Sequence, residues 1–116
     1  MGSGVGMAGR VRRGEIRLVV FPAPDKQRPV VILTRDSILG TLARVTVAPI
    51  TSTVRGIPTE VVLGTDEGLK GACAVNLDNV TTVPQRLLGR RVGTLGQERM
   101  AQVCAGLAFA VGCTTR

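Results

Sequence analysis

The chain contains no histidine, tryptophan or tyrosine, and phenylalanine occurs only twice in its 116 residues. Histidine is the side chain that most often transfers protons near neutral pH, and it is a common metal ligand. Its absence therefore excludes imidazole-based catalysis and histidine-ligated metal sites. The cysteines Cys73, Cys104 and Cys113 include no CxxC pair, so no thiolate zinc site is expected. We predict buried or idle thiols in a reducing cytoplasm, with no metal and no cofactor.

Long apolar segments are missing too. No run approaches the ~20 apolar residues that cross a bilayer, and the first residues lack the charged and apolar regions of a secretory signal. We therefore expect a soluble, cytoplasmic protein without membrane contact. The length fits one domain over residues 11–116, while the glycine-rich residues 1–10 are interpreted as a flexible leader or an expression remnant.

What the chain has in excess is arginine. The formal net charge is +7, and thirteen of the fifteen cationic side chains are arginine. Arginine binds phosphate in a bidentate manner, so this charge favours a polyanionic partner such as nucleic acid. The alternative is an ordinary solvated basic surface.

Hydrophobic residues make up 44% of the chain but aromatic residues only 2%, so the core must consist of Val, Leu, Ile and Ala. β-branched residues crowd the first two thirds, which favours strands there. Ile16, Leu18 and Val20 alternate with Arg17 and Val19, which predicts a half-buried strand with one wetter face. Short apolar or alternating runs predict strands over residues 15–20, 30–33, 42–48, 58–63, 72–77, 80–83 and 91–95.

The periodicity changes near the C-terminus. Apolar residues recur there at intervals of three and four, which predicts one stripe of an amphipathic helix. The stripe consists of Met100, Val103, Cys104, Leu107 and Val111. The gaps between the strands are too short for crossover helices, so a parallel α/β sheet is not expected. We predict a mainly β fold, a small and strongly curved barrel against which the terminal helix packs.

Two segments combine an apolar strand with a polar group at one end. They are Arg28-Pro29-Val30-Val31-Ile32-Leu33 and Ala48-Pro49-Ile50-Thr51-Ser52. If the two strands are adjacent, the Arg28 guanidinium and the Thr51 hydroxyl can hold and polarise one phosphodiester. The alternatives are a surface ion pair of Arg28 with Asp25 or Asp36, and hydroxyls that bond the nearby backbone.

Several short motifs occur together in the order and spacing of one protein family. They are Arg13-Gly14-Glu15-Ile16, Arg28-Pro29-Val30-Val31, Pro49-Ile50-Thr51-Ser52, Gly68-Leu69 and Asp78-Asn79-Val80. Over residues 11–112 the chain resembles the MazF/PemK (Kid-like) toxins. The resemblance implies an SH3-like barrel of the PemK/CcdB type and a homodimer. It further implies metal-independent cleavage of single-stranded RNA at short motifs, leaving a 2′,3′-cyclic phosphate and a 5′-hydroxyl, and a cognate antitoxin that covers the RNA groove.

Residue by residue, the resemblance assigns catalysis to Arg28 and Thr51. Arg28 would stabilise the negative charge that grows on the phosphoryl oxygens, and Thr51 would orient the phosphate or the attacking 2′-hydroxyl. The substrate would be messenger RNA, with ribosomal or transfer RNA as the other possible targets. The side chains that could contact it are Phe21, Asp25, Lys26, Ser52, Thr53, Arg55 and Asp78. For Phe21 the alternative is a core side chain at the end of a strand.

The chain departs from the family pattern in three places. Arg17 stands where many relatives carry an aromatic residue, the short loop before Arg28 offers only Asp25 in place of a glutamate, and Asn76 replaces an arginine that one branch pairs with an aspartate. These departures leave the general base unidentified and favour a structural or substrate-contacting Asp78. Two other functions stay open on the same fold: a CcdB-like poison of DNA gyrase, and an RNA-binding barrel without catalysis.

Overall fold

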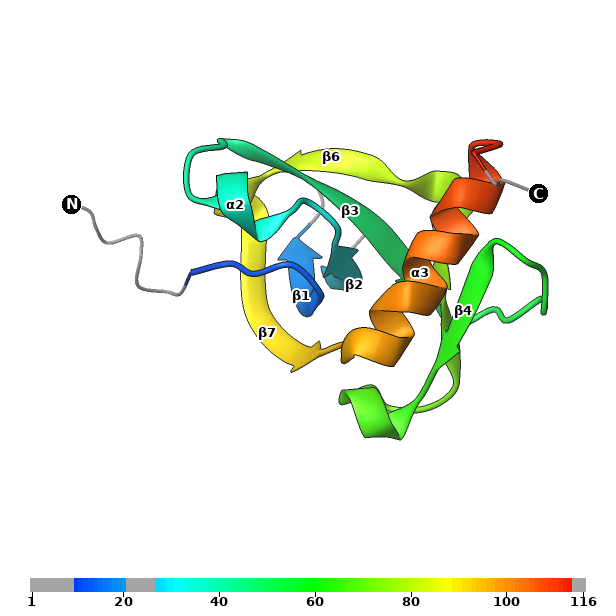
Figure 1. Cartoon of the computed structure of the whole chain (residues 1–116). Helices are drawn as coiled ribbons and strands as arrows, with labels where there is room; N and C mark the ends of the chain where they lie inside the picture. Colours follow the sequence, from blue (N-terminus) through cyan, green and yellow to red (C-terminus); the bar gives the residue numbers. More distant parts are fainter. Residues whose placement is uncertain (1–9, 21–26, 114–116) are drawn as a thin grey trace.

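The computed structural model describes residues 10–20 and 27–113, and it is mostly β with a long C-terminal helix (Figure 1). The strands are β1 (Glu15–Val20), β2 (Gln27–Ile32), β3 (Arg44–Thr51), β4 (Glu60–Leu63), β5 (Cys73–Asn76), β6 (Thr81–Pro84) and β7 (Leu88–Thr94). The helices are α2 (Asp36–Leu39) and α3 (Gln97–Ala110), and short 3₁₀ turns are η1 (Thr65–Glu67), η2 (Leu77–Asn79) and η3 (Gln85–Leu87). The predicted fold class is confirmed.

All the strands belong to one antiparallel sheet. The order along its main path is β4-β5-β3-β2-β1-β7, and β6 pairs with the first half of β3. Within the described residues β4 and β7 stand at opposite ends of this path and do not pair with each other. The expected barrel is therefore open: the sheet is strongly curved, but its edges do not join.

The central strand β2 is buried on both faces. Val31 contributes to a core cluster with Ile16 and Ile50, whereas Val30 and Ile32 join a second cluster with residues of β3. Successive side chains of a strand point to opposite faces. The uninterrupted apolar run of β2 is therefore explained by two hydrophobic clusters, one on each side of the sheet.

The strand β1 differs from its prediction in which face is wet. Arg17 and Val19 are buried, whereas Val20, on the face expected to be apolar, is half exposed. Burial of Arg17 is possible because its Nε donates a 2.9 Å hydrogen bond to Glu15 Oε1 and its Nη1 donates to the Gly89 carbonyl at 3.0 Å. Alternation alone does not show that one strand carries both members of a buried ion pair.

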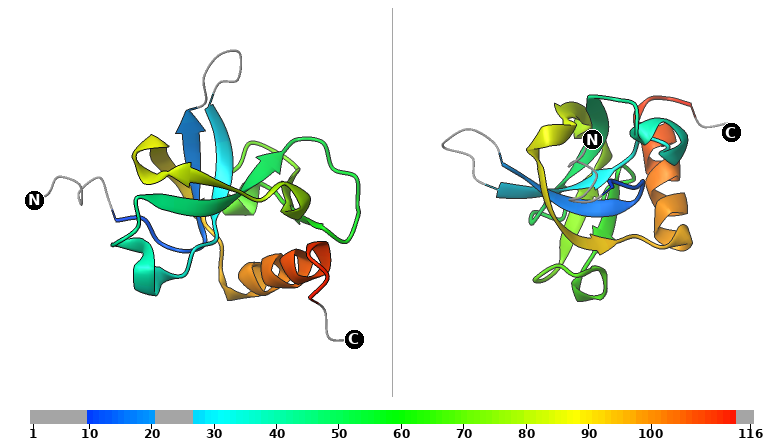
Figure 2. Two further views of the ribbon diagram at one scale, coloured as in Figure 1. Left: turned by 90° about the horizontal axis from the view of Figure 1, so that it is seen from above. Right: turned by 90° about the vertical axis from the view of Figure 1, so that its left-hand side faces the viewer.

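The helix α3 lies on one side of the curved sheet (Figure 2). Met100 and Val103 enter the first core cluster as the stripe predicted, but Cys104 and Val111 are exposed. The contact line runs through Gly106 instead, where a Cβ atom would lie 2.6 Å from Leu77 Cδ1. This part of the predicted stripe is wrong, because a glycine permits close helix packing that a count of apolar residues does not register.

Candidate active site

A cavity of about 760 Å³ opens where the start of β2, the end of β3 and the segment after η1 meet. Residues 27–29 and 50–52 form one wall, and residues 68–73 form the other. Leu18 of β1 and Arg90 and Val92 of β7 complete the lining. The predicted residues Arg28, Thr51 and Ser52 therefore share one cavity.

The pairing of β2 with β3 explains why Arg28 and Thr51 meet. The register places Val30 opposite Pro49 and Val31 opposite Ala48. In an antiparallel pair, the start of one strand lies beside the end of the other. Continuing the register by two residues brings Thr51 opposite Arg28, so the positions of both polar groups follow from the apolar strands that precede or follow them.

Thr51 is held by its own loop. Its Oγ1 accepts a 3.1 Å hydrogen bond from the backbone N–H of Thr53, and the side chain is partly buried. The hydroxyl hydrogen is not used by this bond and can be donated to a ligand. The Thr51 hydroxyl therefore does bond the nearby backbone, as the alternative from the sequence proposed. This bond is compatible with a place for Thr51 in the cavity wall. Thr53 itself does not line the cavity.

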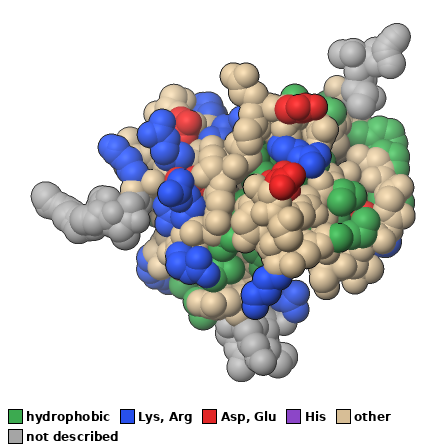
Figure 3. Space-filling model, turned by 90° about the horizontal axis from the view of Figure 1, so that it is seen from below, with side chains coloured by type: hydrophobic (Ala, Val, Ile, Leu, Met, Phe, Trp, Pro, Cys, Tyr) green, Lys and Arg blue, Asp and Glu red, His purple; other side chains and the backbone are tan. Residues whose placement is uncertain are grey.

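The cavity is cationic. Its described lining contains Arg28, Lys70 and Arg90 and no acidic residue. Figure 3 shows Lys and Arg side chains gathered over one half of the face seen from below, with few acidic side chains between them. Nothing in the sequence distinguishes Arg90 from the other arginines of a solvated basic surface. Only the pairing of β7 with β1 brings it beside residues that lie far away in the sequence, so no sequence signal could have found it.

A backbone-to-backbone contact fixes the wall formed by residues 68–73. Gly68 has a φ of +91°, and a Cβ atom on it would lie 2.5 Å from the Val92 carbonyl oxygen. A Cβ atom at Gly93 would overlap the carbonyl oxygen of Glu67. Only glycine allows the turn after η1 to approach β7 this closely. The two glycines thereby set the position of the wall relative to β7.

Ionic contacts hold the same turn from the other side. Glu67 accepts a 2.8 Å hydrogen bond from the Gly64 N–H and a 3.1 Å hydrogen bond from Arg99 Nε of α3. These bonds, the first foremost, hold the pKa of Glu67 below its usual value. Cys73 also lines the cavity. Burial raises the pKa of its thiol, so the thiol is protonated and a poor nucleophile.

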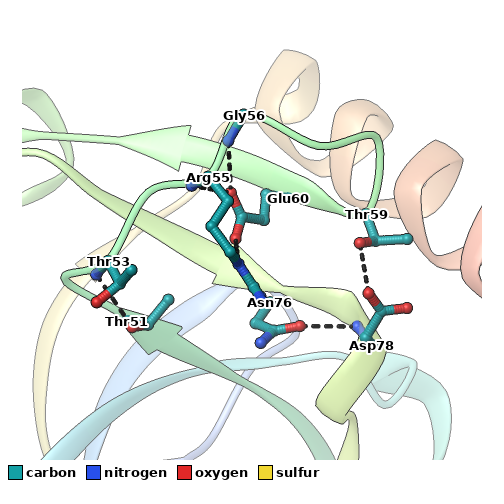
Figure 4. A network of polar contacts seen from close by, with 8 residues as sticks. All are labelled: Thr51, Thr53, Arg55, Gly56, Thr59, Glu60, Asn76 and Asp78. Atoms are coloured by element: carbon teal, nitrogen blue, oxygen red, sulfur yellow. Dashed lines mark hydrogen bonds and ion pairs between the residues drawn. The ribbon is translucent and has the colours of Figure 1, made fainter.

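Arg55 lies outside the cavity lining, in a network of the β3–β4 loop (Figure 4). Its backbone N–H and that of Gly56 donate to Glu60 Oε1 at 2.8 and 3.0 Å, and its Nε donates to Oε2 at 3.1 Å. These bonds, led by the Arg55 N–H, lower the pKa of Glu60. The side chain predicted to contact substrate is therefore tied to a carboxylate that organises the loop.

Asp78 is also engaged in structure (Figure 4). Its Oδ2 accepts a 2.6 Å hydrogen bond from Thr59 Oγ1, and its N–H donates to Asn76 Oδ1 at 2.9 Å. It does not line the cavity. Asn76, which replaces the arginine of one branch of the resembled family, acts here as the cap of η2. The predicted contacts Phe21, Asp25 and Lys26 lie outside the described residues.

The part of the chain that the structure describes offers no group of three His, Cys, Asp or Glu side chains close enough to hold a metal ion. In the same part of the chain, no helix is sufficiently long and apolar to cross a membrane.

Comparison with known proteins gives one consistent answer. Residues 12–111 match the family described as the PemK-like, MazF-like toxin of type II toxin–antitoxin systems. The probable endoribonuclease MazF5 of Mycobacterium tuberculosis is 44% identical over 90 residues, which are 76% of this chain and 82% of that protein. The solved M. tuberculosis toxin MazF-mt6 superimposes with a TM-score of 0.80 at 38% identity, covering 87% of this chain and 99% of its own.

A second solved structure is described as a mycobacterial endoribonuclease in complex with its cognate antitoxin. It superimposes with a TM-score of 0.81 at 27% identity and covers 92% of this chain and 100% of its own. The family match thus spans most of the chain, and similarity in sequence and in structure leads to the same group of proteins. The chain belongs to the PemK/MazF toxin family of type II toxin–antitoxin systems.

Proposed function

We propose that this protein is a sequence-selective endoribonuclease that cuts single-stranded RNA without a metal ion. The observation that carries the proposal is the shared cavity, in which Arg28 and Thr51 from adjacent strands lie among further cations. The relatives named endoribonucleases support the reaction class. A gyrase poison on this fold would not need a guanidinium and an alcohol that line the same cationic cavity.

The reaction that suits these groups is an internal transesterification. The RNA's 2′-oxygen forms a bond to phosphorus as the bond to the 5′-oxygen breaks, giving a 2′,3′-cyclic phosphate and a 5′-hydroxyl. The proton lost from the 2′-hydroxyl and the one gained by the leaving oxygen balance, and no water is consumed. No oxidant, reductant or metal is required by this step.

Arg28 stabilises the charge that develops on the non-bridging oxygens, because its guanidinium stays protonated at any working pH and presents several donors. For the same reason it does not act as the base. Thr51 donates its hydroxyl hydrogen to a phosphoryl oxygen while its lone pair stays with the Thr53 N–H. Preorganised donors of this kind lower the barrier by positioning and electrostatics.

Lys70 and Arg90 retain the substrate by attraction to its backbone. Each removes counterions from the RNA when it contacts a phosphate, so cleavage at low substrate concentration should weaken as salt rises. Gln27 and the segment 69–72 surround the same space and are placed to read the bases. A cognate antitoxin that covers this cavity, a homodimer and a cytoplasmic location complete the proposal.

The test is cleavage of a long single-stranded RNA by the purified protein in EDTA. Arg28→Ala should leave the RNA intact, while the exposed Arg86→Ala, outside the cavity, should cut like the parent. The fragments should carry cyclic phosphate and 5′-hydroxyl ends. A parent that leaves RNA intact but traps gyrase on DNA would establish the gyrase alternative. A folded parent that binds RNA without cutting would establish the non-catalytic one.

A further inference from the structure

A second basic cavity, of about 590 Å³, lies beside the first and has no role in the chemistry above. Its lining includes Arg10, Arg17, Arg90 and Arg91 around a single carboxylate, Glu15. A cavity with four guanidinium groups and one acid is built for an anion.

The one carboxylate is already neutralised. Glu15 Oε1 lies 2.9 Å from Arg17 Nη2 and 2.9 Å from Arg17 Nε, and the two side chains are only 8% and 9% exposed. The same oxygen accepts a hydrogen bond from the Arg12 N–H at 3.2 Å. Because Glu15 and Arg17 neutralise each other, the positive charge of Arg10, Arg90 and Arg91 is not balanced by any other carboxylate of the described lining.

The two cavities share Arg90. Leu18 of β1 lines the first cavity and Arg17 lines the second, and neighbouring residues of a strand point to opposite faces. The cavities therefore lie on opposite faces of the sheet and meet across β7, which ends the strand path within the described residues. In Figure 1, β7 curves along the side of the molecule opposite α3.

Arg90 is placed to serve both cavities. Its side chain is exposed and makes no ion pair or side-chain hydrogen bond with the described residues. The β1–β7 register shifts twice, between Ile16 and Arg17 and between Arg17 and Val19. Such irregularities bend a strand and re-aim its side chains, which explains how one residue of β7 reaches the rims of both cavities.

We propose that RNA bound with its scissile phosphate in the first cavity turns over β7 at Arg90 and places a flanking phosphate in the second cavity. Arg10 and Arg91 bind that phosphate there. The inference rests on the proposed endoribonuclease function. RNA is favoured over an acidic peptide because the continuity through Arg90 joins this cavity to the one that holds the scissile group.

The contact has a distinct kinetic signature. A phosphate contact fixes the position of the nucleic acid but carries no sequence information. Losing it should raise KM for long substrates and leave kcat and the cleaved motif unchanged. For single-stranded RNA, each lost contact should reduce the slope of log affinity against log salt by roughly 0.7.

The experiment begins by sequencing the cut ends of a long RNA to locate the cleaved motif. Oligonucleotides centred on that motif are then shortened from each end in turn. For the parent, kcat/KM should fall about tenfold when one particular flanking phosphate is removed, as for a charged hydrogen bond. With Arg91→Ala or Arg10→Ala the same shortening should have almost no effect, and the shortest cleavable oligonucleotide should be cut as by the parent.

A neutral methylphosphonate at each flanking position locates the contact directly. The substitution should slow the parent at one or two positions, and Arg91→Ala should be insensitive at those same positions. The matched control is Arg86→Ala, which removes an equal charge from an exposed residue outside both cavities. Thermal unfolding of each variant should match the parent, because Arg10, Arg86 and Arg91 are exposed, and the one side-chain bond of Arg91 to the described residues is a 3.3 Å contact with Thr94 Oγ1.

The inference would be overturned if shortening the flanks or adding a methylphosphonate slowed cleavage by Arg91→Ala and Arg10→Ala as much as it slows cleavage by the parent. The inference would also be wrong if Arg91→Ala and Arg10→Ala bound an acidic antitoxin segment more weakly than the parent but cleaved RNA at the parent rate. That result would assign the second cavity to a protein partner. Failure of the underlying function looks different, because then Arg28→Ala would cut as well as the parent or the parent would leave the long RNA intact.

Discussion

The junction of β2 with the end of β3 and the loop that follows β3 carry the same kinds of side chain in different surroundings. At the junction, Arg28 from the start of β2 and Thr51 from the end of β3 line a cationic cavity. A few residues on, Arg55 bonds Glu60 and Thr59 bonds Asp78. The difference lies in the surroundings: Arg55 and Thr59 bond carboxylates of β4 and η2 that shape the loop, whereas Arg28 and Thr51 line a cavity whose described wall also holds Lys70 and Arg90. An arginine or threonine after a strand therefore indicates a functional site where the fold gathers it with further cations around one cavity.

The comparison is tested most strongly by the two arginines. Arg28→Ala should lower kcat for RNA cleavage by about 10²–10³-fold, the usual effect of losing one preorganised donor to a developing oxyanion. Arg55→Ala should cut within about threefold of the parent, and its stability should fall by less than about 1 kcal/mol, because its side chain is 53% exposed. Equal losses of activity in the two variants would show that the loop and the cavity act as one site.

The glycine contact between β7 and the turn after η1 should dominate stability. Gly93→Ala puts a methyl group against the Glu67 carbonyl and should lower the free energy of unfolding by about 1–3 kcal/mol. The displaced cavity wall should also weaken RNA binding. Gly71→Ala, whose Cβ atom meets nothing within 4 Å, is the matched control in urea unfolding. A Gly93→Ala protein as stable as this control would contradict the close contact.

Substitutions of Thr51 and Thr59 should have smaller effects, one on activity and the other on stability. Thr51→Val removes the hydroxyl but keeps the shape, and should slow cleavage about tenfold. It should have little effect on unfolding, because the bond that it loses from the Thr53 N–H is exposed to water. Thr59→Val should leave cleavage near the parent rate but cost about 1 kcal/mol of stability, the typical worth of a hydrogen bond, since Asp78 loses its partner. Chemical denaturation and initial rates on one RNA measure both quantities. If Thr59→Val instead slowed cleavage and Thr51→Val instead lowered stability, Thr59 would be the residue that acts on RNA and Thr51 the structural one.

The weakest effect is the pH dependence of the loop. Hydrogen bonds from the Arg55 and Gly56 N–H groups hold the pKa of Glu60 below its usual 4.5. A carboxylate with a lowered folded pKa stabilises the protein above the unfolded value and loses that contribution as pH falls through the folded one. Glu60→Gln should therefore be less stable than the parent at pH 7, and the gap should close below about pH 4.5 in urea titrations. A gap that persists in acid would exclude this ionic origin.

Much of the fold could be predicted from the sequence because its signals are local. Apolar runs located the strands, and the resemblance to MazF/PemK toxins selected Arg28 and Thr51 before any contact was known. The paired strands then supplied the reason that both belong to one cavity. The roles of the two residues in cleavage stay predictions until they are measured.

The features that sequence patterns missed depend on contacts between distant segments. Arg90 enters the cavity only because β7 pairs with β1, and Arg17 is buried because Glu15 and the Gly89 carbonyl satisfy its donors. A hydropathy pattern shows neither the pairing of β7 with β1 nor the hydrogen-bond partners of Arg17. The helix contact through Gly106 was missed for a related reason, since it depends on the absence of a side chain.

The approach of Gly68 and Gly93 also bears on how toxins of this shape diversify. Main-chain atoms set the gap between β7 and the neighbouring turn, and the gap keeps its dimensions as long as both positions remain glycine. Residues 69–72, which project beyond that fixed point, are free to vary while the gap keeps its dimensions. Grafting this short segment from a relative is therefore a direct route to a new RNA preference on an unaltered frame.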